Sequence, residues 1–171
     1  MTRDLKEIFV RLEGAWASLE LISIRNRDDY LKPFRVLRCK IDDQVDFQAQ
    51  SSDLTATEAT VLIEVFGAQH LVAASGRGPV HAVDNAMRKI LERHYPQLSE
   101  VCLEEFDVRL LPGAPPDDDE KGRGGFGPGL GYLWRRQKTM DTVGVAAGIL
   151  QASVECNIDG LEWKLRGEQK H

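Results

Sequence analysis

Cysteine and histidine are both scarce in this 171-residue sequence, and each shortage excludes a class of site. The three cysteines are Cys39, Cys102 and Cys156, and an odd count without a CxxC pair argues against a disulfide framework and a zinc site. The four histidines form none of the HxH, HxxxH or HExxH spacings typical of metal sites. We therefore expect reduced cysteines, a cytoplasmic protein and no metal ligands.

Basic residues are also fewer than acidic ones. The chain has 22 Lys and Arg against 27 Asp and Glu, which gives a formal net charge of -5. Nucleic-acid binding depends on the neutralisation of phosphates, so this balance disfavours a nucleic-acid partner. No apolar run approaches the ~18 residues of a membrane span, and we expect no membrane association. The first residues lack the apolar segment typical of a secretory signal.

Catalytic patterns are absent as well. The sequence has no GxSxG motif and no GxxxxGK[ST] loop, and "GRGPVH" lacks the third glycine of a dinucleotide fingerprint. Because no base–nucleophile pair and no metal set is visible, we predict no catalytic residues. A complete enzyme is the weakest of the functional hypotheses for this chain.

What the sequence does contain is a change of hydrophobic period that occurs twice. Residues 2–24 carry apolar side chains at helical spacing and predict a helix; the stripe is Leu5, Ile8, Leu12, Trp16 and Leu19. Alternation then predicts strands at 34–42, 58–67 and 68–76, with a loop at 43–57, and a helix follows from Pro79 to just before Pro96.

The second half of the chain has the same order of patterns. Strands are predicted at 101–111, 130–137 and 140–146, with a Pro- and Gly-rich loop at 112–129 and a last helix from Ile149 to Leu165. The sequence thus predicts an α+β fold in which helices cover one face of antiparallel sheet. We divide it into a linker helix and connection at 1–32 and a domain at 33–171, made of two pseudo-repeated βββα units at 33–97 and 98–171.

Two glycines stand directly before the first of these later helices. In "SGRGPVH", Gly76 and Gly78 precede Pro79. A similar pattern of two glycines before a helix, "TVGVAAG" at 142–148, occurs about 68 residues further on. One explanation is structural, because glycine permits a sharp turn from strand to helix. The other is functional, because a bare helix start leaves N–H donors open to an anion such as a carboxylate. The residues alone leave both explanations open.

Five segments in combination resemble a known family. They are "EGAWASLELI" (13–22), "PFRVLRCKI" (33–41), "GRGPVHAVDNAMRKIL" (76–91), "YPQLSEVCLEEFDVRLL" (95–111) and "TVGVAAGILQASVECNIDGLEWKL" (142–165). Together they resemble the C-terminal regulatory region, the LeuA dimer domain, of the 2-isopropylmalate synthase and citramalate synthase family. The first and last segments are similar to the citramalate-type branch in particular.

The resemblance implies a role in feedback inhibition. Domains of this family pair about a two-fold axis and bind a branched-chain amino acid, leucine or isoleucine, at the dimer interface. The catalytic part is a separate TIM barrel that uses a divalent metal and acetyl-CoA, and a chain of 171 residues has no room for an additional barrel of ~250 residues. The expected partners are therefore the effector amino acid, a second copy and a catalytic barrel, with no cofactor in this chain itself.

The same resemblance assigns ligand contacts to three places in the chain. The residues it implies are Gly76, Gly78, Pro79, Val80 and His81 at the helix start, Leu103, Phe106 and Leu110 on the next strand, and Val145 and Ala147 in the second half. Leu103 and Phe106 are three apart, so a regular strand would point them to opposite faces unless a bulge intervenes. Asp84 either accepts from the ligand ammonium or lies exposed on the helix.

A second hypothesis is a structural dimerisation module whose pocket has degenerated. Family members often have Asn where this chain has Gly148, and Tyr where it has Phe106. The segment 126–137 also carries bulky aromatic residues in place of a typical apolar strand. Stereospecific binding of an amino acid would separate the two hypotheses.

Overall fold

The computed structural model describes residues 15–45, 55–101, 107–110, 129–133, 141–146 and 148–166. These residues form helices α2 (Trp16–Arg25), α3 (Pro79–His94) and α4 (Ile149–Leu165), the 3-10 helix η1 (Pro96–Glu100), and strands β1 (Phe34–Val45), β2 (Thr55–Val65), β3 (Ala68–Gly76), β4 (Asp107–Leu110), β5 (Gly129–Leu133) and β6 (Thr142–Val145). The strands make two antiparallel three-stranded sheets, ordered β1-β2-β3 and β4-β5-β6. The α+β class predicted from the sequence is confirmed.

The chain divides into two compact units that do not follow its linear order. The β1–β3 unit comprises Asn26–Cys102 and Leu161–His171, and the β4–β6 unit comprises Met1–Arg25 and Leu103–Gly160. Three strands followed by a helix occur twice along the chain, in the predicted order. That the halves 33–97 and 98–171 are repeats of one another, and that 1–32 is a linker, stay predictions.

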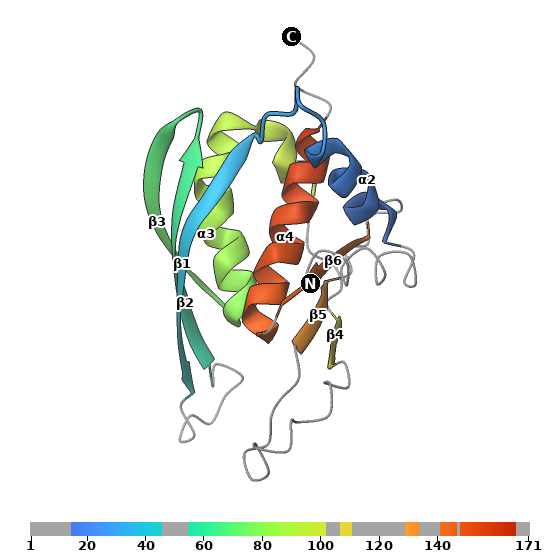
Figure 1. The fold of residues 1–171 in the computed structure, drawn as a ribbon. Helices are drawn as coiled ribbons and strands as arrows, with labels where there is room; N and C mark the ends of the chain where they lie inside the picture. The colour runs from blue at the N-terminus through green and yellow to red at the C-terminus, as the bar shows by residue number, and fades with distance from the viewer. Residues whose placement is uncertain are drawn as a thin grey trace, which may run out of the picture. The chain divides into compact units, whose positions relative to one another are not determined.

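In the β1–β3 unit, helix α3 packs along one face of the sheet (Figure 1). The alternation along β2 explains why, since Val61, Ile63 and Val65 are at most 1% exposed while the residues between them face the other side. β2 and β3 are joined by a two-residue turn at Phe66 and Gly67, both with positive φ, which matches the twist of the flanking strands. The inner face of the sheet and α3 therefore form the core of this unit.

Strands β1 and β2 are longer than the sequence predicted. The predicted loop at 43–57 is wrong at both ends, because Val45 pairs with Thr55 and Asp43 with Thr57. Asp and Gln are poor strand formers, which is why this segment resembled a loop. The hydroxyl of the buried Thr57 donates a hydrogen bond to the Asp43 carboxylate on the neighbouring strand. This cross-strand bond gives a partner to an acidic side chain that, in the sequence, argued against a strand.

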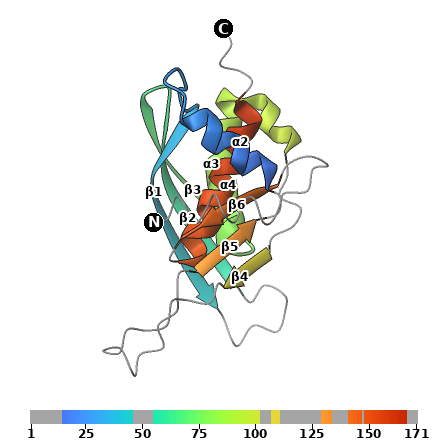
Figure 2. The same cartoon turned by 45° about the vertical axis from the view of Figure 1, so that its right-hand side comes forward.

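In the β4–β6 unit, strands β4, β5 and β6 lie side by side and α2 contacts β6 (Figure 2). The buried side chains of α2 are Ala17, Ser18 and Leu21. Trp16 is 74% exposed, so the predicted apolar stripe is wrong at that position. The reason is that Ser18 accepts a hydrogen bond from the Val143 N–H at 2.9 Å, which turns a polar residue toward the strand. Residues 2–14 of the predicted helix lie outside the described residues.

A partly buried ion network on α3 joins this helix to η1. The Arg88 guanidinium donates to Asp84 at 2.7 Å, to Glu92 at 3.0 Å and to the Leu98 carbonyl oxygen at 2.8 Å. The side chains of Arg88 and Asp84 are only 14% and 7% exposed. Burial by itself lowers the pKa of Arg88, but the two carboxylates outweigh it and raise that pKa above its usual range. Arg88 therefore holds η1 against the helix as a permanent cation.

Replacing Arg88 with methionine is expected to lower the free energy of unfolding by about 3 kcal/mol. The physical reason is that removing one partner of a buried pair leaves the Asp84 carboxylate without its cation. Urea denaturation followed by circular dichroism measures the change. The matched control is Arg93→Met at the exposed end of the same helix, expected to cost less than about 0.5 kcal/mol. Equal losses in the two variants would contradict the assignment.

Candidate ligand-binding site

The predicted site begins where β3 ends and α3 starts. Gly78 is the N-cap of α3, and its carbonyl oxygen accepts from the Ala82 N–H at 2.9 Å. No side chain caps this helix end, and its first turn contains no acidic residue. Pro79 has no N–H, so the N–H groups of the following residues form the positive end of the helix dipole. A small anion at this position would meet donors that no side chain of the first turn neutralises.

The two glycines of this turn have different local roles. A Cβ at Gly76 would collide with the backbone of α3, meeting the Ala82 N and lying 2.7 Å from the Ala82 Cα. A Cβ at Gly78 would have no atom within 4 Å, and its φ of 176° is extended backbone that any residue adopts. The structural explanation therefore accounts for Gly76. Neither conformation nor packing within the described residues requires glycine at Gly78.

The β4–β6 unit also has a closely packed glycine in the strand before α4 and an open one at the helix start. A Cβ at Gly144 would meet the Ala152 carbonyl oxygen and lie 2.9 Å from the Cys156 N. Gly148 corresponds to Gly78 in its surroundings: it precedes the helix, its carbonyl accepts from the Ala152 N–H at 3.0 Å, and a Cβ there would have no atom within 4 Å. Each of the two helices thus follows a strand that contains one closely packed glycine, and a second glycine at the helix start faces open space.

One histidine stands at the first of these turns. His81 is exposed, and its Nδ1 accepts a hydrogen bond from the Arg77 N–H at 3.2 Å. An accepting Nδ1 leaves the proton of the neutral imidazole on Nε2. His81 therefore offers a further donor beside the open helix end.

The structure brings together five of the ten predicted ligand contacts. Gly76, Gly78, Pro79, Val80 and His81 share the β3–α3 turn of the β1–β3 unit. Val145 belongs to β6 of the other unit and is buried, and Leu110 is the last residue of β4. Leu103, Phe106 and Ala147 lie outside the described residues. That the second group of contacts completes the site stays a prediction.

Asp84 is buried, which contradicts the sequence explanation that placed it exposed on the helix. Its exposure is 5%, and it accepts from Arg88 Nε at 2.7 Å. The sequence could not show this, because both residues fall on a helical pattern that is compatible with a solvent-facing side. Its carboxylate serves the internal network of α3.

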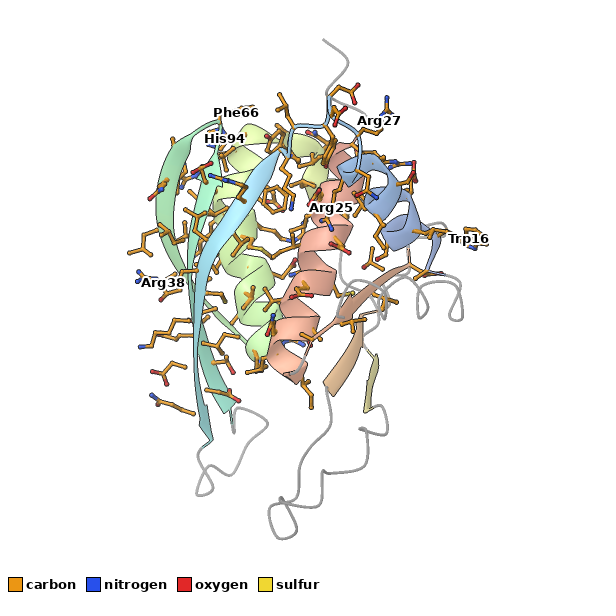
Figure 3. All side chains as sticks on the ribbon, viewed as in Figure 1. Trp16, Arg25, Arg27, Arg38, Phe66 and His94 are labelled. Carbon is orange, nitrogen blue, oxygen red and sulfur yellow. The ribbon has the colours of Figure 1, made fainter. Side chains whose placement is uncertain are left out.

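Sequence reasoning missed an aromatic cluster at the far end of α3. The exposed Phe66 ring lies 5.8 Å from the ring of His94 and 5.7 Å from that of Tyr95, and Figure 3 shows Phe66 and His94 next to each other. His70 lies 5.7 Å from His94 and has a buried Nε2 without a hydrogen-bond partner. Phe66 is 77% exposed in a turn conformation that favours glycine and asparagine. The cluster presents an exposed aromatic side chain at the hairpin end.

No described helix is long and apolar enough to span a membrane. No group of three or more His, Cys, Asp or Glu residues in the described ranges is placed to hold a metal ion.

The model of a known family matches residues 20–120 of this chain, a segment that includes the β3–α3 turn. That family is described as the LeuA allosteric (dimerisation) domain. The chain belongs to this family. The resemblance inferred from the five sequence segments is thereby confirmed, and a regulatory and dimerisation role is the role of the family as a whole.

The curated relatives of this LeuA-type domain are (R)-citramalate synthases. That of Geobacter sulfurreducens is 34% identical over 98% of this chain and 30% of its own length. Those of Synechocystis sp. and Aquifex aeolicus are 32% and 30% identical over 96% and 98% of this chain, and 29% and 30% of their own lengths. The chain therefore spans about 30% of the length of these relatives.

Alanine at Gly76 or at Gly144 is expected to lower the free energy of unfolding by about 1–3 kcal/mol, because a Cβ would collide with backbone that cannot move aside. Serine at Gly78 or Gly148 is the matched control. Both positions face open space, and serine is a favoured N-cap, so stability should stay the same or rise slightly. Thermal unfolding of the four variants measures the contrast, and a stable Gly144→Ala protein would contradict it.

Proposed function

We propose that this chain is the effector-binding and dimerisation region of a citramalate synthase-type enzyme, and that its effector is a branched-chain amino acid. Support comes from the family and from relatives named (R)-citramalate synthase. The observation that carries the proposal is the open space at Gly78 beside an uncapped helix start. The catalytic barrel, with its divalent metal and acetyl-CoA, would belong to a part of the enzyme that this chain does not contain.

The helix start can recognise the carboxylate common to all amino acids. The N–H groups of Val80 and His81 lie at the positive end of a 16-residue helix. A charged ligand at a helix start gains about 0.3–1 kcal/mol from the dipole, and up to ~2 kcal/mol when it is partly buried. Such a contribution is too small for recognition by itself, so the aliphatic side chain must supply the remaining affinity and the choice between leucine and isoleucine.

Regulation would follow from linkage between the two parts of the enzyme. If the amino acid weakens substrate binding to the barrel by favouring one conformation, substrates that favour the other conformation must weaken amino-acid binding by the same factor. The proposed assembly is a homodimer in the cytoplasm. The domain family supports the dimer, while the compartment rests on the sequence expectation of reduced cysteines.

A second function, a dimerisation module without a ligand, is favoured by one observation. Gly148 is exposed and faces open space at the start of α4, where the resemblance expects an asparagine side chain. An absent amide removes a donor and an acceptor from that helix end. The two functions differ in whether the folded dimer binds an amino acid.

Calorimetric titration of the chain with L-isoleucine, L-leucine and L-valine tests the proposal. We expect one L-isomer to bind with a micromolar to low-millimolar Kd at one or fewer sites per chain, and D-isoleucine to give no heat. Gly78→Val fills the open space and is expected to weaken that binding at least tenfold. Because valine is a poor N-cap residue, the thermal midpoint should fall slightly while the protein stays folded.

The control for this titration is Arg93→Met, an exposed change at the other end of α3 that should leave binding unchanged. Absence of heat with all three L-amino acids on a folded dimer would overturn effector binding and favour the structural module. Binding that is insensitive to Gly78→Val would place the amino acid elsewhere on the domain.

A further inference from the structure

The two edges of the β1-β2-β3 sheet are not equivalent. On the β3 edge, Lys89 Nζ donates to the Ala73 carbonyl oxygen at 2.8 Å and Asn85 Nδ2 donates to that of Ser75 at 3.0 Å. Ala73 and Ser75 are two apart, so their carbonyls point to the same side of the strand. Side chains of α3 thus occupy acceptors that an additional strand would need, which is a common way of protecting a sheet edge.

Among the described residues, nothing protects the β1 edge in this way. In the part of the chain that the structure describes, no residue of β1 makes a backbone hydrogen bond outside its ladder with β2. β1 has 12 residues, and the register is regular from Arg38 to Val45, beyond the irregularity at Val36/Arg38. A row of unpaired N–H and C=O groups on a long, regular edge strand is a template for pairing with another strand.

The side chains of β1 are self-complementary about one residue. Arg38, Lys40 and Asp42 lie on the outer face, where Figure 3 shows Arg38 pointing away from α3, and none of the three forms an ion pair within the described residues. An antiparallel pair of β1 strands centred on Ile41 places Lys40 of each copy opposite Asp42 of the other. The same register places Arg38 opposite Gln44, so no like charges meet directly.

Neighbouring registers lose this match. Centring the pair on Lys40 places two lysines opposite each other, and centring it on Asp42 does the same with two aspartates, which is unfavourable in both cases. A shift that pairs residues of opposite faces would move the apolar side chains of β1 to the solvent side. The charges that normally discourage edge pairing here select a single register.

The inner face of β1 adds an apolar contribution. Its residues Val36, Cys39 and Ile41 are only partly buried, whereas Val61 and Ile63 on the central strand are fully buried. The same register places Cys39 opposite Asp43, whose carboxylate already accepts from the Thr57 hydroxyl. A two-fold axis through Ile41, perpendicular to the sheet, brings the two Ile41 side chains together on this inner face. It also keeps the α3 helices of both copies on the same side of the joined sheet.

From these observations we infer that β1 pairs with β1 of a second copy of this chain, centred on Ile41, to form one six-stranded antiparallel sheet. The inference rests on the dimerisation proposed above and adds the strand, register and charge pairs through which it occurs. Its partner is chosen by charge complementarity, since the pattern of Lys40 and Asp42 fits a second copy in reverse direction.

Charge-reversal variants test the register directly. Lys40→Asp alone places two carboxylates opposite each other at each of these pairs, and Asp42→Lys alone places two ammonium groups together. Each single variant should therefore dimerise at least tenfold more weakly than the wild type. An equal mixture of the two variants restores both ion pairs and should form heterodimers, as should the double variant K40D/D42K with itself. Sedimentation of the full chain over a range of concentrations measures the Kd, and circular dichroism checks that each variant is folded.

The control is Arg93→Glu, an equally large charge change on the exposed end of α3, which should leave the Kd unchanged. Monomeric wild-type protein at all concentrations would overturn the proposed dimerisation itself. A wild-type dimer that both single variants leave intact would keep dimerisation and overturn the β1 interface. Single variants that dissociate but do not recover on mixing would overturn the register centred on Ile41.

Discussion

The close approach of a glycine in a strand to the following helix constrains the geometry of both units. The backbone at Gly76 lies against Ala82 in the first turn of α3, and the backbone at Gly144 lies against Ala152 and Cys156 of α4, at distances that no Cβ permits. Because the strand end and the helix start are held this closely, the N-terminus of each helix has a fixed position. Everything proposed for ligand binding depends on that position.

Burial of apolar side chains is not directional, so hydrogen bonds and ion pairs fix how the elements are oriented. In the β4–β6 unit, Asp159 accepts from Arg25 at 2.9 Å and from Ser18 at 3.3 Å, and all three side chains come from helices. In the β1–β3 unit, Tyr30 donates to Glu162 at 2.8 Å and Tyr95 to the Pro33 carbonyl oxygen at the same distance. Each of these buried carboxylates has a donor, so its burial does not leave a charge unsatisfied.

The proposed regulation and the inferred interface use different parts of the same unit. The open helix start lies at the β3–α3 turn, while the unprotected edge is β1 on the other side of β2. Helix α3 connects them, since it packs on the inner face of the sheet and supplies the side chains that occupy the β3 edge. An anion that orders the first turn of α3 would therefore act on the element that also supports the joined sheet.

The sequence by itself determined the order of the elements, the α+β class and the family, because periodicity of two and of 3.6 and the five matching segments are properties of local sequence. It also placed two glycines before a helix, but it could not assign packing to Gly76 and open space to Gly78, since both residues have the same side chain and only the neighbours differ. Tertiary structure decided that Asp84 is buried and Trp16 exposed, against their expected environments. Asp84 is held by Arg88 one helical turn away, and Ser18 rather than Trp16 meets the Val143 N–H of β6. Tertiary structure also decided that β1 continues to Val45: cross-strand hydrogen bonds hold acidic residues in a strand that their own preferences would not form.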